Sequence, residues 1–319
     1  MSGLILNSEG KADVQEMRRN SSLVVNGTLP YEAYKAWDPK LVEISKAKLT
    51  FAQDLAKYGL VDTRYDLGDI TVNYEKISEM SAATASMGGV TKGQDDRLVF
   101  TTAGVPMPIF HKEFRLGARE IQAAAKSPNR GLSTFHIEQS GRKVLESVNS
   151  MFFDGVSDIE VDSNVIYGLT SHPNRGTVSA TAAWGSGGDD PIADVESMLA
   201  AAYANYFDGP FVLYISNDNK AFCEKDYSAT KGEKTFIERF LSYSAIAEVK
   251  FESGLANGEA VLVQMTSDVV ELKVAQELVA FEQPQSHRLQ HDFMVMAAMA
   301  FVVKSDANNN CGVVHLTGA

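Results

Sequence analysis

The chain has 319 residues, of which 45% are hydrophobic and 22% are charged, a balance that excludes a wholly disordered chain, a collagen and a coiled-coil rod. Its formal net charge of −12 disfavours a dedicated nucleic-acid binder and a membrane-surface protein, because an acidic surface repels phosphate. The two cysteines, Cys223 and Cys311, are too few for a disulfide framework or a cysteine-based zinc site.

No targeting or membrane segment is predicted. Residues 1–27 are polar and contain no apolar run of signal-peptide length after a basic start. The richest apolar run, residues 293–303, is about half the roughly 18 uninterrupted apolar residues that a membrane span needs. We therefore expect a soluble protein in a reducing compartment, without contact to a membrane.

The N-terminal region predicts an arm followed by a helix. Residues 1–30 show no sustained periodicity. A helix should follow over 39–58, because Asp38 is a good N-cap and Pro39 suits the first helical position. Gly59 is placed to end this helix.

Residues 60–112 predict a long two-stranded excursion. Residues 69–74 alternate polar and apolar, residues 97–102 form a second strand, and residues 81–93 between them are mostly small. The excursion has no visible core of its own. A long segment of this kind in a compact protein usually binds something or lies on a neighbour.

The strongest helical pattern covers residues 134–153. Its apolar side chains fall at helical spacing on one stripe. We expect the following members of the stripe to be core residues: Ile137, Val144, Leu145, Val148 and Phe152. The opposite face is charged and carries Glu138 and Arg142, a favourable pair four residues apart.

The rest of the chain mixes helices and strands. One helix should begin at Asp190–Pro191, and a second should cover 234–241. Asn257–Gly258 is a hairpin signal between strands expected at 247–252 and 260–265. Further strands are expected within 160–185 and at 211–216, 269–274, 277–281 and 293–303. Because the order shows no βαβ regularity, we predict the α+β class.

Three sequence patterns partly match known phosphate-binding or metal-binding motifs, but each lacks a required residue. The loop 88–93 lacks the Lys-Ser/Thr pair of a phosphate-binding loop, and Asp95 with Asp96 would repel phosphate. His287 and His291 have a metal-ligand spacing but no visible third ligand. Residues 306–312 resemble the start of a calcium loop, but position twelve is Thr317 and not glutamate.

Signatures of catalysis are also missing. The sequence has no Gly-x-Ser-x-Gly elbow and no Gly-x-Gly-x-x-Gly dinucleotide signature. Cys223 lies near lysines, but a buried or incidental thiol is the simpler interpretation. We therefore predict no catalytic residue, no cofactor and no metal, and a protein that is not an enzyme.

Several short stretches resemble one known family. They are VPMPIFHKEF at 105–114, GLSTFHIEQSGRKV at 131–144, FDG at 153–155, IYGLT at 166–170 and PNR at 173–175. The first three are similar to the segment that leaves the extended loop and enters the spine helix in the encapsulin-like branch of the Hong Kong 97-type fold. The last two resemble the strand and turn that follow the spine. Tailed-bacteriophage major capsid proteins and encapsulin shells share this fold.

By order of elements the resemblance covers residues 30–304 and implies five regions. These are an N-terminal arm and helix (1–59), an extended loop (60–112), a peripheral domain with the spine helix (113–190), an axial domain (191–267) and the returning peripheral strands with the C-terminus (268–319). We expect the loop 81–97 to act between subunits through polar contacts of Lys92, Asp95, Asp96 and Arg97. One family member cross-links its shell through a loop lysine, but no decisive match predicts this here.

The resemblance implies a structural subunit. It would assemble with itself, as hexamers and pentamers, into an icosahedral shell that encloses phage DNA without binding it specifically. Its location would be the virion capsid, assembled in the bacterial host cytoplasm, with portal, scaffolding or decoration proteins as further partners. Two alternatives stay open. One is an encapsulin-type compartment that encloses cargo enzymes, and the other is a hydrolase whose site is not recognised.

Overall fold

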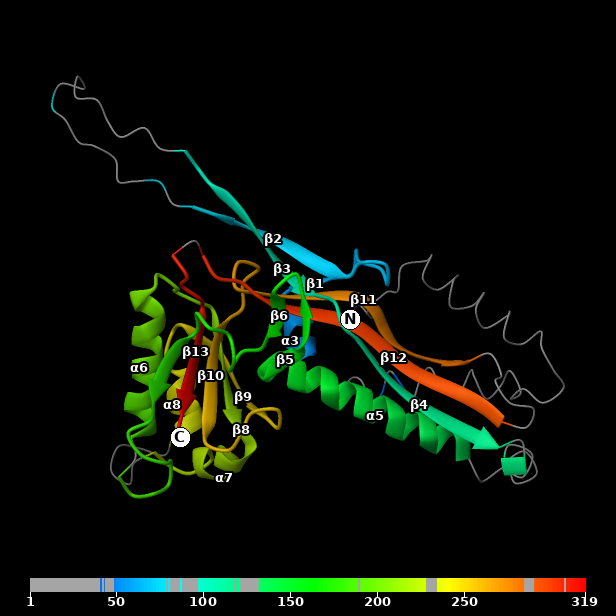
Figure 1. Ribbon diagram of the computed structural model, residues 1–319. Coiled ribbons are helices and arrows are strands. Elements are labelled where there is room, and N and C mark those ends of the chain that lie inside the picture. The colour runs from blue at the N-terminus through cyan, green and yellow to red at the C-terminus, as the bar shows by residue number, and fades with distance from the viewer. Residues whose placement is uncertain are drawn as a thin grey trace. The chain divides into compact units, whose positions relative to one another are not determined.

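The computed structural model describes residues 41, 43, 49–78, 80, 87, 97–117, 119–120, 132–188, 190–227, 234–283, 290–306 and 308–319. The chain forms two units, and each takes its described residues from three separate stretches. The first unit draws on Met1–Ile70, Met107–Phe152 and Leu272–Ala300, and the second on Thr71–Pro106, Phe153–Glu271 and Phe301–Ala319. Helices and strands are mixed along the chain, which confirms the predicted α+β class (Figure 1).

The first unit combines a four-stranded sheet with helices. Its sheet has the order β1-β11-β12-β4, in which β1 is parallel to β11 and β12 is antiparallel to β4. The strand bounds are β1 (Val61–Asp62), β4 (Ile109–Gly117), β11 (Val270–Glu282) and β12 (Gln290–Val303). The separate strands predicted within 269–281 are thus one continuous strand.

Helix α5 (Leu132–Phe153) supplies the core of the first unit. The five residues predicted as its buried stripe are each no more than 3% exposed. Aromatic contacts join it to its neighbours. His136 stacks on Phe114 of β4 at 5.7 Å between ring centroids, and Phe152 contacts Phe51 at 5.3 Å.

Phe51 belongs to α3 (Thr50–Lys57), which ends as the sequence predicts. Gly59 follows with φ +73°, a left-handed conformation that glycine adopts without strain. The single helix predicted over 39–58 is wrong, because Leu49 is not helical and α3 begins at Thr50. Asp38 and Pro39, the predicted start, lie outside the described residues. Within the described part of the chain, no helix combines the length and the apolar character needed to cross a membrane.

The second unit contains two ribbons and a five-stranded sheet. Strands β2 (Thr71–Ile77) and β3 (Phe100–Pro106) form one antiparallel ribbon, and β5 (Gly155–Val161) and β6 (Asn164–Tyr167) form the other. The sheet has the order β7-β13-β10-β8-β9. Its strands are β7 (Gly176–Ser179), β8 (Phe211–Ser216), β9 (Ile246–Glu252), β10 (Glu259–Gln264) and β13 (Val313–Thr317).

Both faces of this sheet are covered. Leu213 and Ile215 of β8 pack in one buried cluster with Met198 of α6 (Pro191–Ala204) and Phe240 of α8 (Phe236–Leu241). Tyr214 alternates to the opposite face and lies with its ring centroid 6.3 Å from that of Phe153. A short 3-10 helix (Asn217–Asn219) and α7 (Lys220–Cys223) follow β8.

The start of α6 is as predicted. Pro191 occupies the first turn, and the Asp190 carboxylate accepts a hydrogen bond of 3.1 Å from the backbone N–H of Ala193. This side chain satisfies one of the backbone donors that a helix N-terminus leaves unpaired.

The predicted hairpin at Asn257–Gly258 is wrong. Strands β9 and β10 are not neighbours, because β8 lies between them, parallel to β9 and antiparallel to β10. Every residue of β8 is buried, so both of its edges need backbone partners. The backbone of Gly258 instead forms hydrogen bonds with two other segments of the chain. Its N–H donates to Asp218, and its carbonyl accepts from the N–H of Ala319.

Strand β13 belongs to the five-stranded sheet of the second unit. It pairs with β10 and with β7, inside the sheet that also contains residues 211–264. The region predicted as returning peripheral strands with the C-terminus, 268–319, includes this strand, and that division stays a prediction. A short apolar strand does not indicate its partner, because its alternation fits any buried edge of suitable length.

Candidate functional site

The ribbon β2–β3 has two different faces, which its register sets. Val72 lies opposite Val105, and both side chains are buried. Glu75 lies opposite Thr102, and both are exposed. Because side chains alternate along a strand, one face of the ribbon packs against its own unit and the other meets solvent.

The far end of the described ribbon exposes apolar side chains. Met80, Val99 and Phe100 are each 60% exposed, and Leu98 is 43% exposed. The backbone N–H of Ser78 donates to the Val99 carbonyl at 3.0 Å, so the two chains still pair here. Successive residues of a strand point to opposite faces of the ribbon. Because Leu98, Val99 and Phe100 are all exposed, neither face of the ribbon is covered here by the rest of the described chain. We call Met80 and Leu98–Phe100 the apolar ribbon segment.

An exposed group of large apolar side chains is typical of interaction sites. The polar residues predicted to act beside it are described only in part. Lys92, Asp95 and Asp96 lie outside the described residues. Arg97 is exposed and directly precedes the apolar ribbon segment. Its contact with a second subunit stays a prediction.

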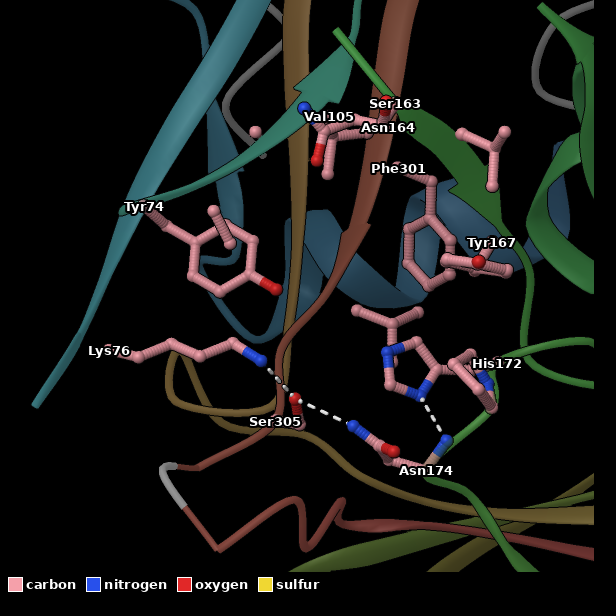
Figure 2. Close-up of a pocket in the computed structure, with 15 residues that line it drawn as sticks. Tyr74, Lys76, Val105, Ser163, Asn164, Tyr167, His172, Asn174, Phe301 and Ser305 are labelled. Atoms are coloured by element: carbon pink, nitrogen blue, oxygen red, sulfur yellow. Dashed lines mark hydrogen bonds between the residues drawn. The ribbon is translucent and has the colours of Figure 1, made fainter. Parts of the chain in front are cut away.

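A polar cluster holds β2 at Lys76, which pairs with Thr101 next to the apolar ribbon segment (Figure 2). The Lys76 ammonium donates to the Ser305 hydroxyl at 2.7 Å, and the Asn174 side-chain amide donates to the same hydroxyl at 3.2 Å. The Asn174 amide also lies 3.3 Å from the side-chain oxygen of Asn309. Strand β2 is thereby connected to the loop after β6 and to the turn after β12.

His172 is the buried centre of this cluster. Its Nδ1 accepts a hydrogen bond of 3.2 Å from the backbone N–H of Asn174, so the proton of the neutral ring is on Nε2. Burial lowers the pKa of His172 to about 4, and the positive charges of Lys76 and Arg175 act in the same direction. The ring is therefore neutral at pH 7.

A pocket of about 180 Å³ lies between the ribbon and these residues. Its walls include Tyr74, Lys76, Tyr167, His172 and Phe301. No sequence pattern indicates this site. Its residues come from positions 74–76, 103–105, 163–174 and 301–305, and no spacing within the sequence joins them.

The two sequence patterns considered for metal binding form no metal site among the residues that the structure describes. His291 is buried in β12 and makes a 2.6 Å hydrogen bond to Glu282, while His287 lies outside the described residues. Asp306 accepts hydrogen bonds from the backbone and side-chain nitrogens of Asn310, as a turn-forming residue does. Among the described residues, no group of three or more His, Cys, Asp or Glu side chains could hold a metal ion.

Both thiols are buried. Desolvation raises the pKa of Cys223 to about 12 and that of Cys311 to about 12, so neither supplies a thiolate at neutral pH. This agrees with the interpretation of Cys223 as a buried thiol.

Several solved structures that superpose on this chain are subunits of capsids or virus-like particles. The chain superposes on the capsid of Myoviridae phage XM1 with a TM-score of 0.64 and 13% identity, over 82% of this chain and 89% of that one. For the virus-like particle from Pyrococcus furiosus the TM-score is 0.59 with 16% identity, over 90% and 98%. For the capsid of an empty GTA particle it is 0.56 with 12% identity, over 99% and 100%. The chain thus has the Hong Kong 97-type fold of phage capsid proteins.

A family model also matches the sequence. It covers residues 22–316 and is described as a family of unknown function (DUF6260). The chain belongs to this family. A comparison with curated proteins finds no match.

Proposed function

We propose that this protein is the major capsid protein of a tailed bacteriophage, a subunit that self-assembles into an icosahedral shell around the phage genome. The apolar ribbon segment carries the proposal. Met80, Val99 and Phe100 are each 60% exposed in the single chain. A second copy of the chain that covers them would remove this apolar surface from water, which favours association. The Hong Kong 97-type fold supports the same role.

The other parts of the chain fit a structural role. Residues 60–112 would be the extended loop, 113–190 the peripheral domain and 191–267 the axial domain, with hexamers and pentamers as the assembly units. The protein would have no catalytic activity. It would assemble in the host cytoplasm and reside in the virion, with portal, scaffolding or decoration proteins as partners. The net charge of −12 suits a shell that encloses DNA without binding it.

The decisive experiment changes the apolar ribbon segment. The variants Phe100→Glu and Val99→Glu place a charge on an exposed site, so the folded subunit should melt within about 1 °C of wild type, since surface changes cost little. Particle formation, measured by negative-stain microscopy and sedimentation, should fall at least tenfold. The matched control Phe100→Leu keeps an apolar side chain and should form particles. Normal particles from both charged variants would refute this role for the segment.

A deletion of residues 84–94 tests the rest of the predicted loop. Surface loops tolerate length changes at low cost, so circular dichroism should show an intact fold. Particle formation should fail or the particles should become fragile. Full-sized particles of unchanged stability would contradict an assembly role for residues 81–97.

An encapsulin-type compartment is the second candidate, and the likeness to the virus-like particle from Pyrococcus furiosus favours it. The contents of particles from the native source separate the two functions. Genome-length DNA protected from nuclease supports a capsid. A co-purifying enzyme without such DNA supports a compartment.

A further inference from the structure

The pocket beside the ribbon β2–β3 is lined by hydrogen-bond donors, and two of them have no acceptor among the described residues. His172 is only 5% exposed, and Figure 2 shows its free ring nitrogen pointing into the pocket. Among the described residues, no hydrogen bond engages His172 Nε2 or the Tyr74 hydroxyl. Lys76 has the Ser305 hydroxyl as an acceptor and forms no ion pair with a described carboxylate. Donors that line a pocket and have no acceptor among the described residues are available to an acceptor that enters the pocket.

The charges around the pocket favour an anion. None of the 15 residues that line it is an aspartate or a glutamate. Lys76 contributes one positive charge, and the neutral His172 contributes a donor without a charge. A single positive charge matches a carboxylate, whereas a phosphate dianion would leave an uncompensated negative charge in a half-enclosed site.

We propose that this pocket is a binding site for a carboxylate group, held by the Lys76 ammonium, the Nε2–H of His172 and the Tyr74 hydroxyl. A volume of about 180 Å³ accommodates a carboxylate and the carbons that carry it. Two sources share this chemistry. One is a small free carboxylate, and the other is an Asp or Glu side chain of a second copy of this chain, which carries 41 acidic residues. Only the second source rests on the proposed shell function.

The first test uses the purified full chain and acetate as the probe. Thermal unfolding is followed at pH 7 in sodium acetate and in sodium chloride of equal ionic strength. The melting temperature should rise with acetate concentration above its value in chloride, because a ligand that binds only the folded state stabilises it. Lys76→Met should abolish this difference. The control Lys112→Met removes an exposed lysine of β4 and should retain it.

A second variant protects the test against misfolding of the first. Tyr74→Phe removes one donor and keeps the ring, so it should fold and weaken acetate binding about tenfold, the usual effect of losing a hydrogen bond to a charged group. An acetate response of Tyr74→Phe equal to that of wild type would count against the proposal.

High-resolution microscopy of assembled particles identifies the source. Density that continues into an Asp or Glu of a neighbouring subunit assigns a side chain, and isolated density assigns a free carboxylate. Either result supports the site. Equal melting in acetate and chloride, together with a pocket that holds no carboxylate in the particle, overturns it. If no particle forms, the shell function fails and the acetate test alone decides.

Discussion

Gly155 and Gly168 approach each other so closely that neither position has room for a Cβ atom. A Cβ on Gly168 would overlap the Phe153 carbonyl and the Gly155 nitrogen, and one on Gly155 would overlap the Ile166 carbonyl. Thr170 closes the same contact, because its N–H and its hydroxyl both donate to the Phe153 carbonyl at 2.9 Å. The stretches 153–155 and 166–170 thus meet at this contact.

Gly168→Ala should destabilise the second unit by about 1–3 kcal/mol or more, because the new methyl group forces backbone segments apart. Chemical denaturation monitored by circular dichroism measures the loss. Gly188→Ala is the matched control, since a Cβ there meets no atom within 4 Å. Equal midpoints for the two variants would show that the contact relaxes without cost.

Asp194→Asn should lower the free energy of unfolding by about 1–3 kcal/mol. The buried carboxylate accepts hydrogen bonds from the N–H and the hydroxyl of Thr181 and, at 2.9 Å, from the indole N–H of Trp184. An amide can accept on one side only, so its NH₂ group would oppose one of these donors. Trp184 fluorescence during urea unfolding reports the change. The exposed Asp268→Asn serves as control and should match wild type. A normal midpoint for Asp194→Asn would mean that the donors find other acceptors.

His172 should make the protein less stable as the pH falls. Its pKa is about 4 in the folded state, against 6.5 ordinarily, so below pH 6.5 the unfolded chain binds a proton that the folded chain does not. The free energy of unfolding therefore decreases between pH 6.5 and about 4, by up to roughly 3 kcal/mol from this residue.

His172→Gln removes this component, so its stability should fall less steeply over that pH range. The exposed His111→Gln is the control and should follow wild type. Denaturation curves at several pH values give the slopes. Identical slopes for wild type and His172→Gln would exclude His172 as the source.

Val148→Asp should prevent normal folding of the first unit. Val148 is fully buried in α5, and an unpaired carboxylate there costs at least about 3 kcal/mol. We expect insoluble protein on expression. Ser150→Asp adds the same side chain at an exposed position of the helix and should remain soluble. Soluble, assembling Val148→Asp protein would mean that this face tolerates charge.

Local signals predicted local structure well. The Asp190 cap and the Gly59 stop act through backbone groups a few residues away, and the apolar stripe of α5 follows from helical periodicity. Pairing between distant strands was not predictable in this way. Asn257–Gly258 forms a turn, but the fully buried β8 occupies the position that a hairpin partner would take.

The pocket could not be predicted from the sequence for the same reason. Lys76 and Ser305 are 229 positions apart, and neither carries a pattern that points to the other. For the candidate site, the sequence indicated only that residues 60–112 lack a core of their own. This agrees with the exposure of the apolar ribbon segment. The inter-subunit contacts of Lys92, Asp95 and Asp96 stay predictions, because these residues lie outside the described part of the chain.

The interleaving of the two units has a consequence for biosynthesis. Each unit needs three separate stretches of chain, and neither can close before residues beyond 271 have left the ribosome. Until then β10 and β7 lack β13, which pairs with both, and the nascent chain exposes strand edges that can pair with other chains. Neither unit can be excised as a continuous fragment, so fragments that end before residue 272 should depend on chaperones or aggregate.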